Sequence, residues 1–178
     1  TLTPNEKAVD DYAAVFRAIH DKVDYFVINV SCPNISDLHV LQDQKFLEAI
    51  LERILEVRRE IQSAKPVLLK ISPDLNNKQL DETIALVSKL KLDGIVATNT
   101  TITRNNLKTK EQKLDSIGEG GMSGASVTER SLEVVRYISN RTGGNLPIIG
   151  VGGIMSVSDA LNMLSAGATL IQIYTGFI

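Results

Sequence analysis

Polar residues that could hold a small planar molecule follow the short apolar segments of this chain. Asn29 and Asn34 lie at and after the segment 25–30, and Asn99 and Thr100 end the segment 94–100. An amide donates and accepts hydrogen bonds at once, which suits a planar heterocycle with amide edges. Any one of these residues is more often a turn or cap residue. Four of them at strand ends favour a binding site.

Cys32 is the only cysteine, so an internal disulfide is excluded. It lies two residues past the segment 25–30 and directly before Pro33, where we expect a loop. Two interpretations stay open, a catalytic thiol and a small core residue. His20 and His39 are expected at a helix end and in a loop, and no spacing of histidine, cysteine and carboxylates suggests a metal site.

Lys70 lies near the end of the apolar segment 67–71. An unpaired ammonium group is costly to bury, so it should face an anion, a polar ligand or a carboxylate. The alternative is a lysine whose stem packs while its ammonium reaches solvent.

The glycines are concentrated in the last third of the chain. Of the 12 glycines, only Gly94 precedes Gly118. Three segments combine glycine with small residues, at 120–124, 150–153 and 174–176. Such backbone binds phosphate between a strand and a helix, so we expect a phosphate site there. Two other structures would show the same residues: glycine-rich turns that only shorten the connection between a strand and a helix, and a mobile surface loop.

The elements that must position these residues alternate along the chain. Apolar segments predict strands at 25–30, 67–71, 94–100, 147–153 and 170–174, the first of them buried on both faces. Amphipathic stretches predict helices from near Thr3 to 19, then at 46–61, 77–90, 128–140 and 158–166. This alternation indicates an α/β fold with parallel strands. An eight-stranded barrel is favoured over an open doubly wound sheet, because polar residues gather at the carboxyl end of every strand.

Composition excludes several classes of protein. The net charge is −2, and 22% of the residues are charged. Positive and negative residues are interspersed along the chain, so no basic surface for a nucleic-acid partner is suggested. The apolar runs are far shorter than the roughly 18 residues that cross a bilayer. We therefore expect a soluble segment.

Six motifs resemble dihydroorotate dehydrogenase closely and in family order. They are Asn29-Val30-Ser31-Cys32-Pro33-Asn34, Lys70, Thr98-Asn99-Thr100-Thr101, Gly121-Met122-Ser123-Gly124, Ile148-Ile149-Gly150-Val151-Gly152-Gly153 and Gln172-Ile173-Tyr174-Thr175-Gly176. The resemblance covers essentially the whole chain. It implies an FMN-dependent (β/α)8 barrel that oxidises dihydroorotate to orotate in the biosynthesis of the pyrimidine UMP.

The resemblance also implies roles for individual residues. Cys32 would be the base that removes a proton from C5 of dihydroorotate while hydride passes from C6 to flavin N5. The substrate would be held by Asn29, Asn34, Asn99 and Thr100. The FMN would be held by Asn29, Lys70 and Thr98 at its ring and by Gly124, Gly153, Tyr174 and Thr175 at its phosphate. No metal is implied.

Most of the motifs resemble class 2, the quinone-reducing enzymes that associate peripherally with the cytoplasmic side of the membrane. That class usually has serine as the base, and Cys32 is typical of the soluble class 1 enzymes. Asp37 and His39 also depart from the usual glycine and arginine. We expect a class 2-like enzyme with a cysteine base and a quinone as electron acceptor.

The length points to part of a barrel. A complete barrel typically needs about 250 residues, and this sequence has 178. By resemblance, residues 1–178 are the C-terminal portion of one FMN-binding barrel domain and supply strands 4–8. The first three strands, the membrane-associating segment and the last helix would lie outside this sequence.

Two other interpretations stay open. The chain could be a catalytically inert partial barrel that binds phosphate or flavin weakly, or one that oligomerises to cover its sheet edges. It could also be another FMN-dependent or cysteine-dependent barrel oxidoreductase, although the motif around Cys32 argues against this. The oligomeric state is not predicted.

Overall fold

A computed structural model describes residues 7–30, 44–105, 107, 109, 111–118 and 120–178. In this part of the chain five strands form one sheet in the order β1-β2-β3-β4-β5, and every pair is parallel. The strands are β1 (Phe26–Asn29), β2 (Val67–Ile71), β3 (Gly94–Ala97), β4 (Ile148–Val151) and β5 (Leu170–Gln172). Each strand pairs with the next along the chain, whereas a doubly wound sheet reverses its order at a switch point. The structure thus confirms the predicted parallel α/β fold.

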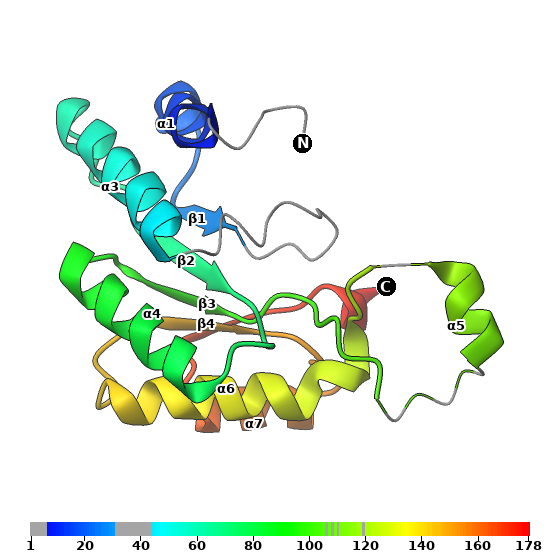
Figure 1. The fold of residues 1–178 in the computed structure, drawn as a ribbon. Coiled ribbons are helices and arrows are strands. Elements are labelled where there is room, and N and C mark those ends of the chain that lie inside the picture. The colour runs from blue at the N-terminus through cyan, green and yellow to red at the C-terminus, as the bar shows by residue number, and fades with distance from the viewer. Residues whose placement is uncertain (1–6, 31–43, 106, 108, 110, 119) are drawn as a thin grey trace.

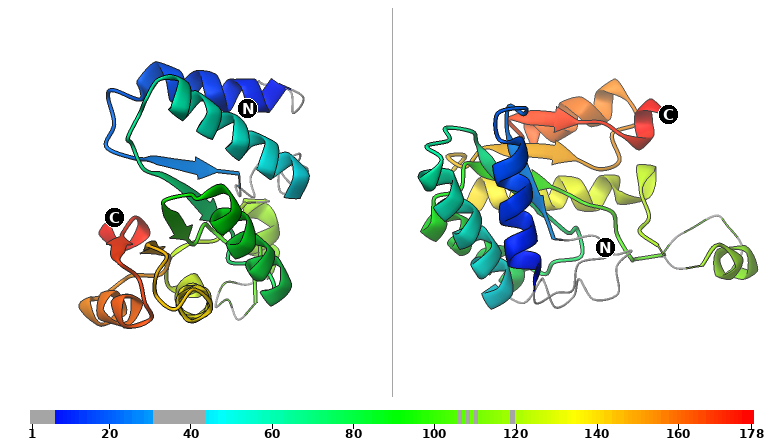
Figure 2. Two further views of the ribbon diagram at one scale, coloured as in Figure 1. Left: turned by 90° about the vertical axis from the view of Figure 1, so that its left-hand side faces the viewer. Right: turned by 90° about the horizontal axis from the view of Figure 1, so that it is seen from above.

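Helices connect the strands and lie along one face of the curved sheet (Figures 1 and 2). They are α1 (Ala8–Ile19), α3 (Gln44–Glu60), α4 (Asn77–Leu90), α6 (Thr128–Arg141) and α7 (Val157–Ser165). Two 3-10 helices, η2 (Gly124–Val127) and η3 (Thr175–Phe177), begin within the glycine-rich segments 120–124 and 174–176. A short helix, α5 (Glu111–Ile117), projects from the body in a stretch for which no element was predicted, and its Ile117 is 67% exposed.

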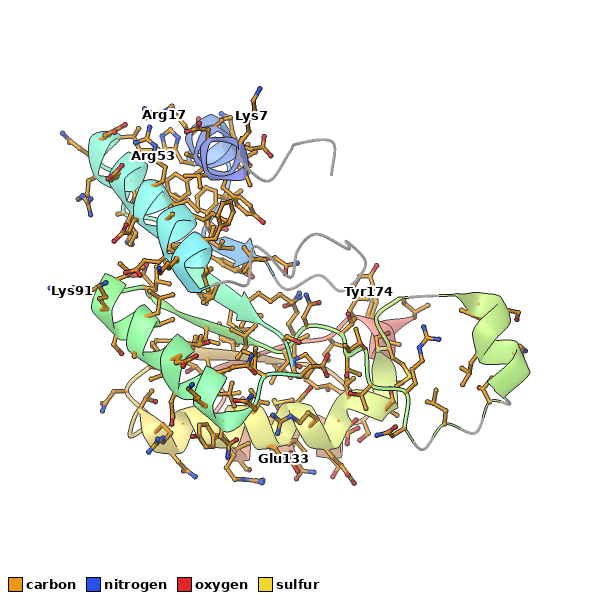
Figure 3. The ribbon with its side chains drawn as sticks, viewed as in Figure 1. Lys7, Arg17, Arg53, Lys91, Glu133 and Tyr174 are labelled. Carbon is orange, nitrogen blue, oxygen red and sulfur yellow. The ribbon has the colours of Figure 1, made fainter. Side chains whose placement is uncertain are left out.

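Local sequence explains where the helices begin and how they hold together. Asn76 caps α4, because its Oδ1 accepts from the Gln79 amide at 3.0 Å while the Gln79 side chain accepts from the Asn76 amide at 2.9 Å. Arg17 of α1 and Arg53 of α3 both bond Glu60, and they lie on the outer surface of this helix pair (Figure 3). The expected start of α1 near Thr3 lies outside the described residues.

The two faces of the sheet have different surroundings. The main core packs the helices against residues such as Phe26, Leu69 and Ile95. The opposite, inner face carries a smaller apolar cluster of Leu68, Val96 and Val151.

The expectation that the first strand is buried on both faces is wrong. Burial alternates along β1, and Val27 is 36% exposed. The reason is that Phe26 and Ile28 face the helices, whereas Val27 and Asn29 lie on the inner face of the sheet, where β1 has a strand only on one side. Leu170 of β5 is 60% exposed at the other edge of the same sheet.

Candidate functional site

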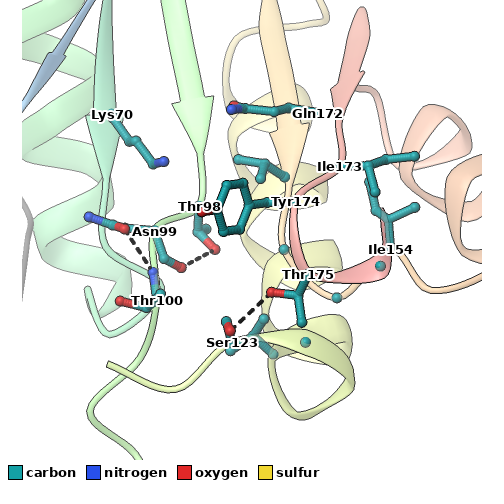
Figure 4. Close-up of a pocket in the computed structure, with 16 residues that line it drawn as sticks. Lys70, Thr98, Asn99, Thr100, Ser123, Ile154, Gln172, Ile173, Tyr174 and Thr175 are labelled. Carbon is teal, nitrogen blue, oxygen red and sulfur yellow. Dashed lines mark hydrogen bonds between the residues drawn. The ribbon is translucent and has the colours of Figure 1, made fainter. Parts of the chain in front are cut away.

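A cavity of about 370 Å³ opens at the carboxyl ends of the strands (Figure 4). Five segments of the chain line it. They contribute Lys70; Thr98, Asn99 and Thr100; Ser123, Gly124 and Val127; and the runs 151–154 and 172–176. The cavity therefore brings together the ends of β2, β3, β4 and β5 and all three glycine-rich segments that the sequence singled out, because parallel strands present their carboxyl ends at one edge. Asn29, at the end of β1, is not among the lining residues.

Asn29 and Asn99 meet above the end of β2. The Nδ2 of Asn99 donates to the Oδ1 of Asn29 at 3.2 Å. Asn29 is also the register partner of Lys70, so β1 and β2 present an amide and an ammonium group side by side. The Oδ1 of Asn99 in turn accepts from the amide of Thr100 at 3.0 Å. Four of the predicted residues thus form one group: Asn29, Lys70, Asn99 and Thr100.

Thr98 lies in the wall of the cavity and is 2% exposed. Its amide donates to the carbonyl of Val151 at 2.6 Å, and the next amide, of Asn99, donates to the carbonyl of Ile71 at 2.8 Å. The chain beyond β3 is therefore held on both sides. The Thr98 hydroxyl is 2.9 Å from the Oγ of Ser131, a fully buried residue of α6.

Ser131 was missed by reasoning from the sequence. A serine on the buried face of a helix carries no local signal for contact with a strand end 33 positions earlier. Gly152 makes this arrangement possible, since its φ is +118° and a Cβ there would lie 2.4 Å from the Ser131 hydroxyl.

The glycine-rich segments meet at the other end of the cavity. The hydroxyl of Thr175 donates to the Oγ of Ser123 at 3.0 Å. Gly153 has a φ of +70°, and its carbonyl accepts from the Thr128 hydroxyl at 2.7 Å. A Cβ at Gly153 would lie 2.1 Å from that hydroxyl, so only glycine fits. Tyr174 stands at the rim and is 75% exposed.

Four residues that the sequence singled out are not among the residues that the structure describes. Cys32 and Asn34 lie outside the described residues, as do Asp37 and His39. Among the residues that the structure describes, no group of three histidine, cysteine or carboxylate residues could hold a metal ion. None of the described helices is long and apolar enough to span a bilayer.

A profile of the dihydroorotate dehydrogenase family matches residues 1–178. The chain belongs to the dihydroorotate dehydrogenase family. It is 47% identical over 176 residues to the dihydroorotate dehydrogenase (quinone) of Christiangramia forsetii (strain DSM 17595 / CGMCC 1.15422 / KT0803), covering 99% of this chain and 51% of the relative. It is 49% identical over 181 residues to the enzyme of the same name from Cyanothece sp. (strain PCC 7425 / ATCC 29141), covering 99% of this chain and 48% of the relative.

Solved structures agree with the family assignment. DHODH from Eimeria tenella, in complex with ferulenol, superposes with a TM-score of 0.84 at 28% identity, over 99% of this chain and 50% of the other. The ligand-free form gives the same score over 52% of its chain. This chain therefore spans about half the length of the curated relatives it matches.

The comparisons bear on the predicted subclass as well. The relatives are named for quinone, as expected for a class 2-like member of the dihydroorotate dehydrogenase family.

Gln172 also lines the cavity, although the sequence assigned a role only to the nearby Tyr174 and Thr175. Its register partner is Val151, so its side chain lies on the inner face of the sheet.

Proposed function

We propose that residues 1–178 form the C-terminal portion of one barrel domain in an FMN-dependent dihydroorotate dehydrogenase. The whole enzyme would oxidise dihydroorotate to orotate in pyrimidine biosynthesis and pass the electrons to a quinone. The observation that carries the proposal is the cavity, whose two ends differ in chemistry and which is lined by five of the six family motifs.

The residues of the cavity suit FMN. At one end lie the hydroxyls of Ser123 and Thr175, next to Gly124, where a Cβ would lie 3.3 Å from the Thr175 methyl group. Small hydroxyls and glycine backbone suit a phosphate. The ring end would lie near Lys70 and the buried Thr98, with Val151 and Ile154 as apolar walls. When bound, FMN supplies the redox chemistry, by accepting a hydride and releasing electrons.

The chain's own residues would bind and orient the other components. Gly124, Gly153, Tyr174 and Thr175 would hold the phosphate. The positive charge of Lys70 would stabilise negative charge that develops on the ring during reduction.

The substrate would lie against the amide groups. Asn29, Asn34, Asn99 and Thr100 would bind the carboxylate and the pyrimidine edges of dihydroorotate, since amides match such edges with donors and acceptors. Cys32 would take the proton from C5. A free thiol has a pKa of about 8.5, so it loses its proton far more easily than the serine hydroxyl usual in class 2.

Two observations support the view that this chain is part of a barrel. The relatives are about twice its length, and the inner face of the sheet is open at both edges, at Val27 and Leu170. Because the proposed acceptor dissolves in lipid, the complete enzyme would lie peripherally at the cytoplasmic side of a membrane, through a segment outside this sequence.

The test is the flavin spectrum of the complete enzyme. Purified protein should show flavin absorbance that bleaches with dihydroorotate and returns with a soluble quinone. Colourless protein that cannot be loaded with FMN would favour the inert partial barrel. Yellow protein that ignores dihydroorotate would favour another flavin oxidoreductase, and protein reoxidised only by other acceptors would exclude the quinone.

A further inference from the structure

Asp74 binds the chain directly after the proposed substrate residues. It lies in the loop after β2, and its carboxylate accepts from the hydroxyl of Thr101 and, at 3.0 Å, from the amide of Ile102. Hydrogen bonds to a carboxylate are about twice as strong as those between neutral groups. One side chain therefore fixes two donors immediately beyond Asn99 and Thr100.

Thr101 is the point where two sides of the cavity join. It is 6% exposed, and it pairs with Met122 through two backbone hydrogen bonds of 3.0 and 2.7 Å. Met122 directly precedes Ser123 and Gly124, which line the phosphate end of the cavity. Thr101 is therefore tied to the phosphate end of the cavity by its backbone and to Asp74 by its side chain, so loss of the side-chain bond leaves the backbone pairing in place.

Arg130 holds the loop of Asp74 against α6. Its Nε donates to the carbonyl of Pro73 at 2.8 Å, and its Nη2 donates to the carbonyl of Leu75 at 2.6 Å. These carbonyls flank Asp74 on either side. The backbone on both sides of the carboxylate is thus tied to a helix.

We propose that Asp74 is a positioning residue, which holds Asn99 and Thr100 in the geometry that binds dihydroorotate and acts through Thr101. The inference rests on the proposed function. It assigns a role in substrate binding to a side chain that does not line the cavity. An asparagine at position 74 has one oxygen in place of two. If its NH2 group faced the Ile102 amide, two donors would meet and that bond would be lost. If it faced the Thr101 hydroxyl, the hydroxyl would have to accept where it now donates, so either orientation weakens the hold on this segment.

The test compares Asp74→Asn with Asp81→Asn in the complete enzyme. Asp81 is the matched control, because its carboxylate also accepts several hydrogen bonds, from Arg141 and Tyr137, but lies between α4 and α6 away from the cavity. We expect Asp74→Asn to raise the Kd for orotate, measured by calorimetry, and the KM for dihydroorotate about tenfold. FMN content and kcat at saturating substrate should stay within about twofold of wild type, as should all these quantities in Asp81→Asn.

A second variant keeps the inference testable if Asp74→Asn does not fold. Thr101→Val should raise the same Kd, because it removes the hydroxyl that Asp74 holds. The rise in the double variant should be smaller than the two single rises combined, because Asp74 keeps the Ile102 amide but no longer the hydroxyl in Thr101→Val. Additive effects, or an unchanged Kd in Asp74→Asn or in Thr101→Val, would overturn the positioning role. If wild-type enzyme neither binds orotate nor oxidises dihydroorotate, it is the proposed function that fails.

Discussion

The side chains of Asn29 and Asn99 share a hydrogen bond of 3.2 Å although 70 residues separate them in sequence. β2 lies between their two strands, so the bond crosses the end of β2 close to Lys70.

Replacing Asn99 should weaken substrate binding. Asn99→Ala removes the partner of Asn29 and the acceptor of the Thr100 amide. We expect the KM for dihydroorotate to rise about tenfold or more, as for loss of a hydrogen bond at a polar site. Steady-state kinetics of the complete enzyme measure this, with Asn145→Ala as the control, since Asn145 is exposed and bonds only locally to Thr142. Equal KM values in the two variants would remove Asn99 from the substrate site.

Ser131 should contribute to stability through Thr98. Ser131→Ala leaves the buried Thr98 hydroxyl with only the longer bond to the Asn99 carbonyl, at 3.2 Å. The free energy of unfolding should fall by about 1 kcal/mol. Urea unfolding checks this against Ser88→Ala, an exposed serine of α4. An equal effect of the two substitutions would show that the Thr98 contact adds nothing.

Gly153 should tolerate no side chain. Gly144 is the matched control, because its φ of +72° is almost that of Gly153 but a Cβ there would meet nothing within 4 Å. Gly144→Ala should cost about 1 kcal/mol of stability from backbone strain alone. Gly153→Ala should cost about 1–3 kcal/mol more, because of the clash with Thr128, and should lower FMN content. Similar melting temperatures for the two variants would contradict this.

Asp81 should make stability depend on pH in the acid range. Arg141, and to a lesser degree Tyr137, hold the pKa of Asp81 below its usual range. A carboxyl whose pKa is lowered by folding stabilises the protein above the unfolded pKa of about 4, and this contribution is lost as pH falls through the folded pKa. Unfolding of wild type and Asp81→Asn should therefore differ at pH 6 and converge toward pH 2. Asp10→Asn, an exposed position on α1, serves as the control, and a gap that is constant with pH would argue against ionisation of Asp81 as the cause.

Cys32 is the proposed base of the reaction. In the complete enzyme Cys32→Ala should abolish steady-state turnover and leave FMN bound. Cys32→Ser should retain some turnover, with a pH profile displaced upward, because a hydroxyl ionises far less readily than a thiol. Near-normal turnover of Cys32→Ala would remove this residue from the mechanism.

The parts of this protein that were predictable from sequence are those with local causes. Apolar strands alternate with amphipathic helices, and this period predicted the parallel fold. The polar residues at strand ends, Asn29, Lys70 and Asn99, were found because parallel strands bring such ends to one edge. The segment that contains Gly153 was found because glycine-rich backbone between a strand and a helix suits a phosphate. The burial of the first strand was predicted wrongly, since an apolar run does not reveal whether a partner covers each face.

The sequence by itself determined the family, the order of the elements and the residue types at the site. Only the tertiary structure decided which side chains support them: Ser131 behind Thr98, Asp74 on Thr101 and Ile102, and Arg130 on the carbonyls that flank Asp74. Arg130 and Pro73 are 57 positions apart, and Asp74 and Ile102 are 28 apart. Such contacts follow from strand order and register, which the whole sheet sets and which no local pattern of residues encodes.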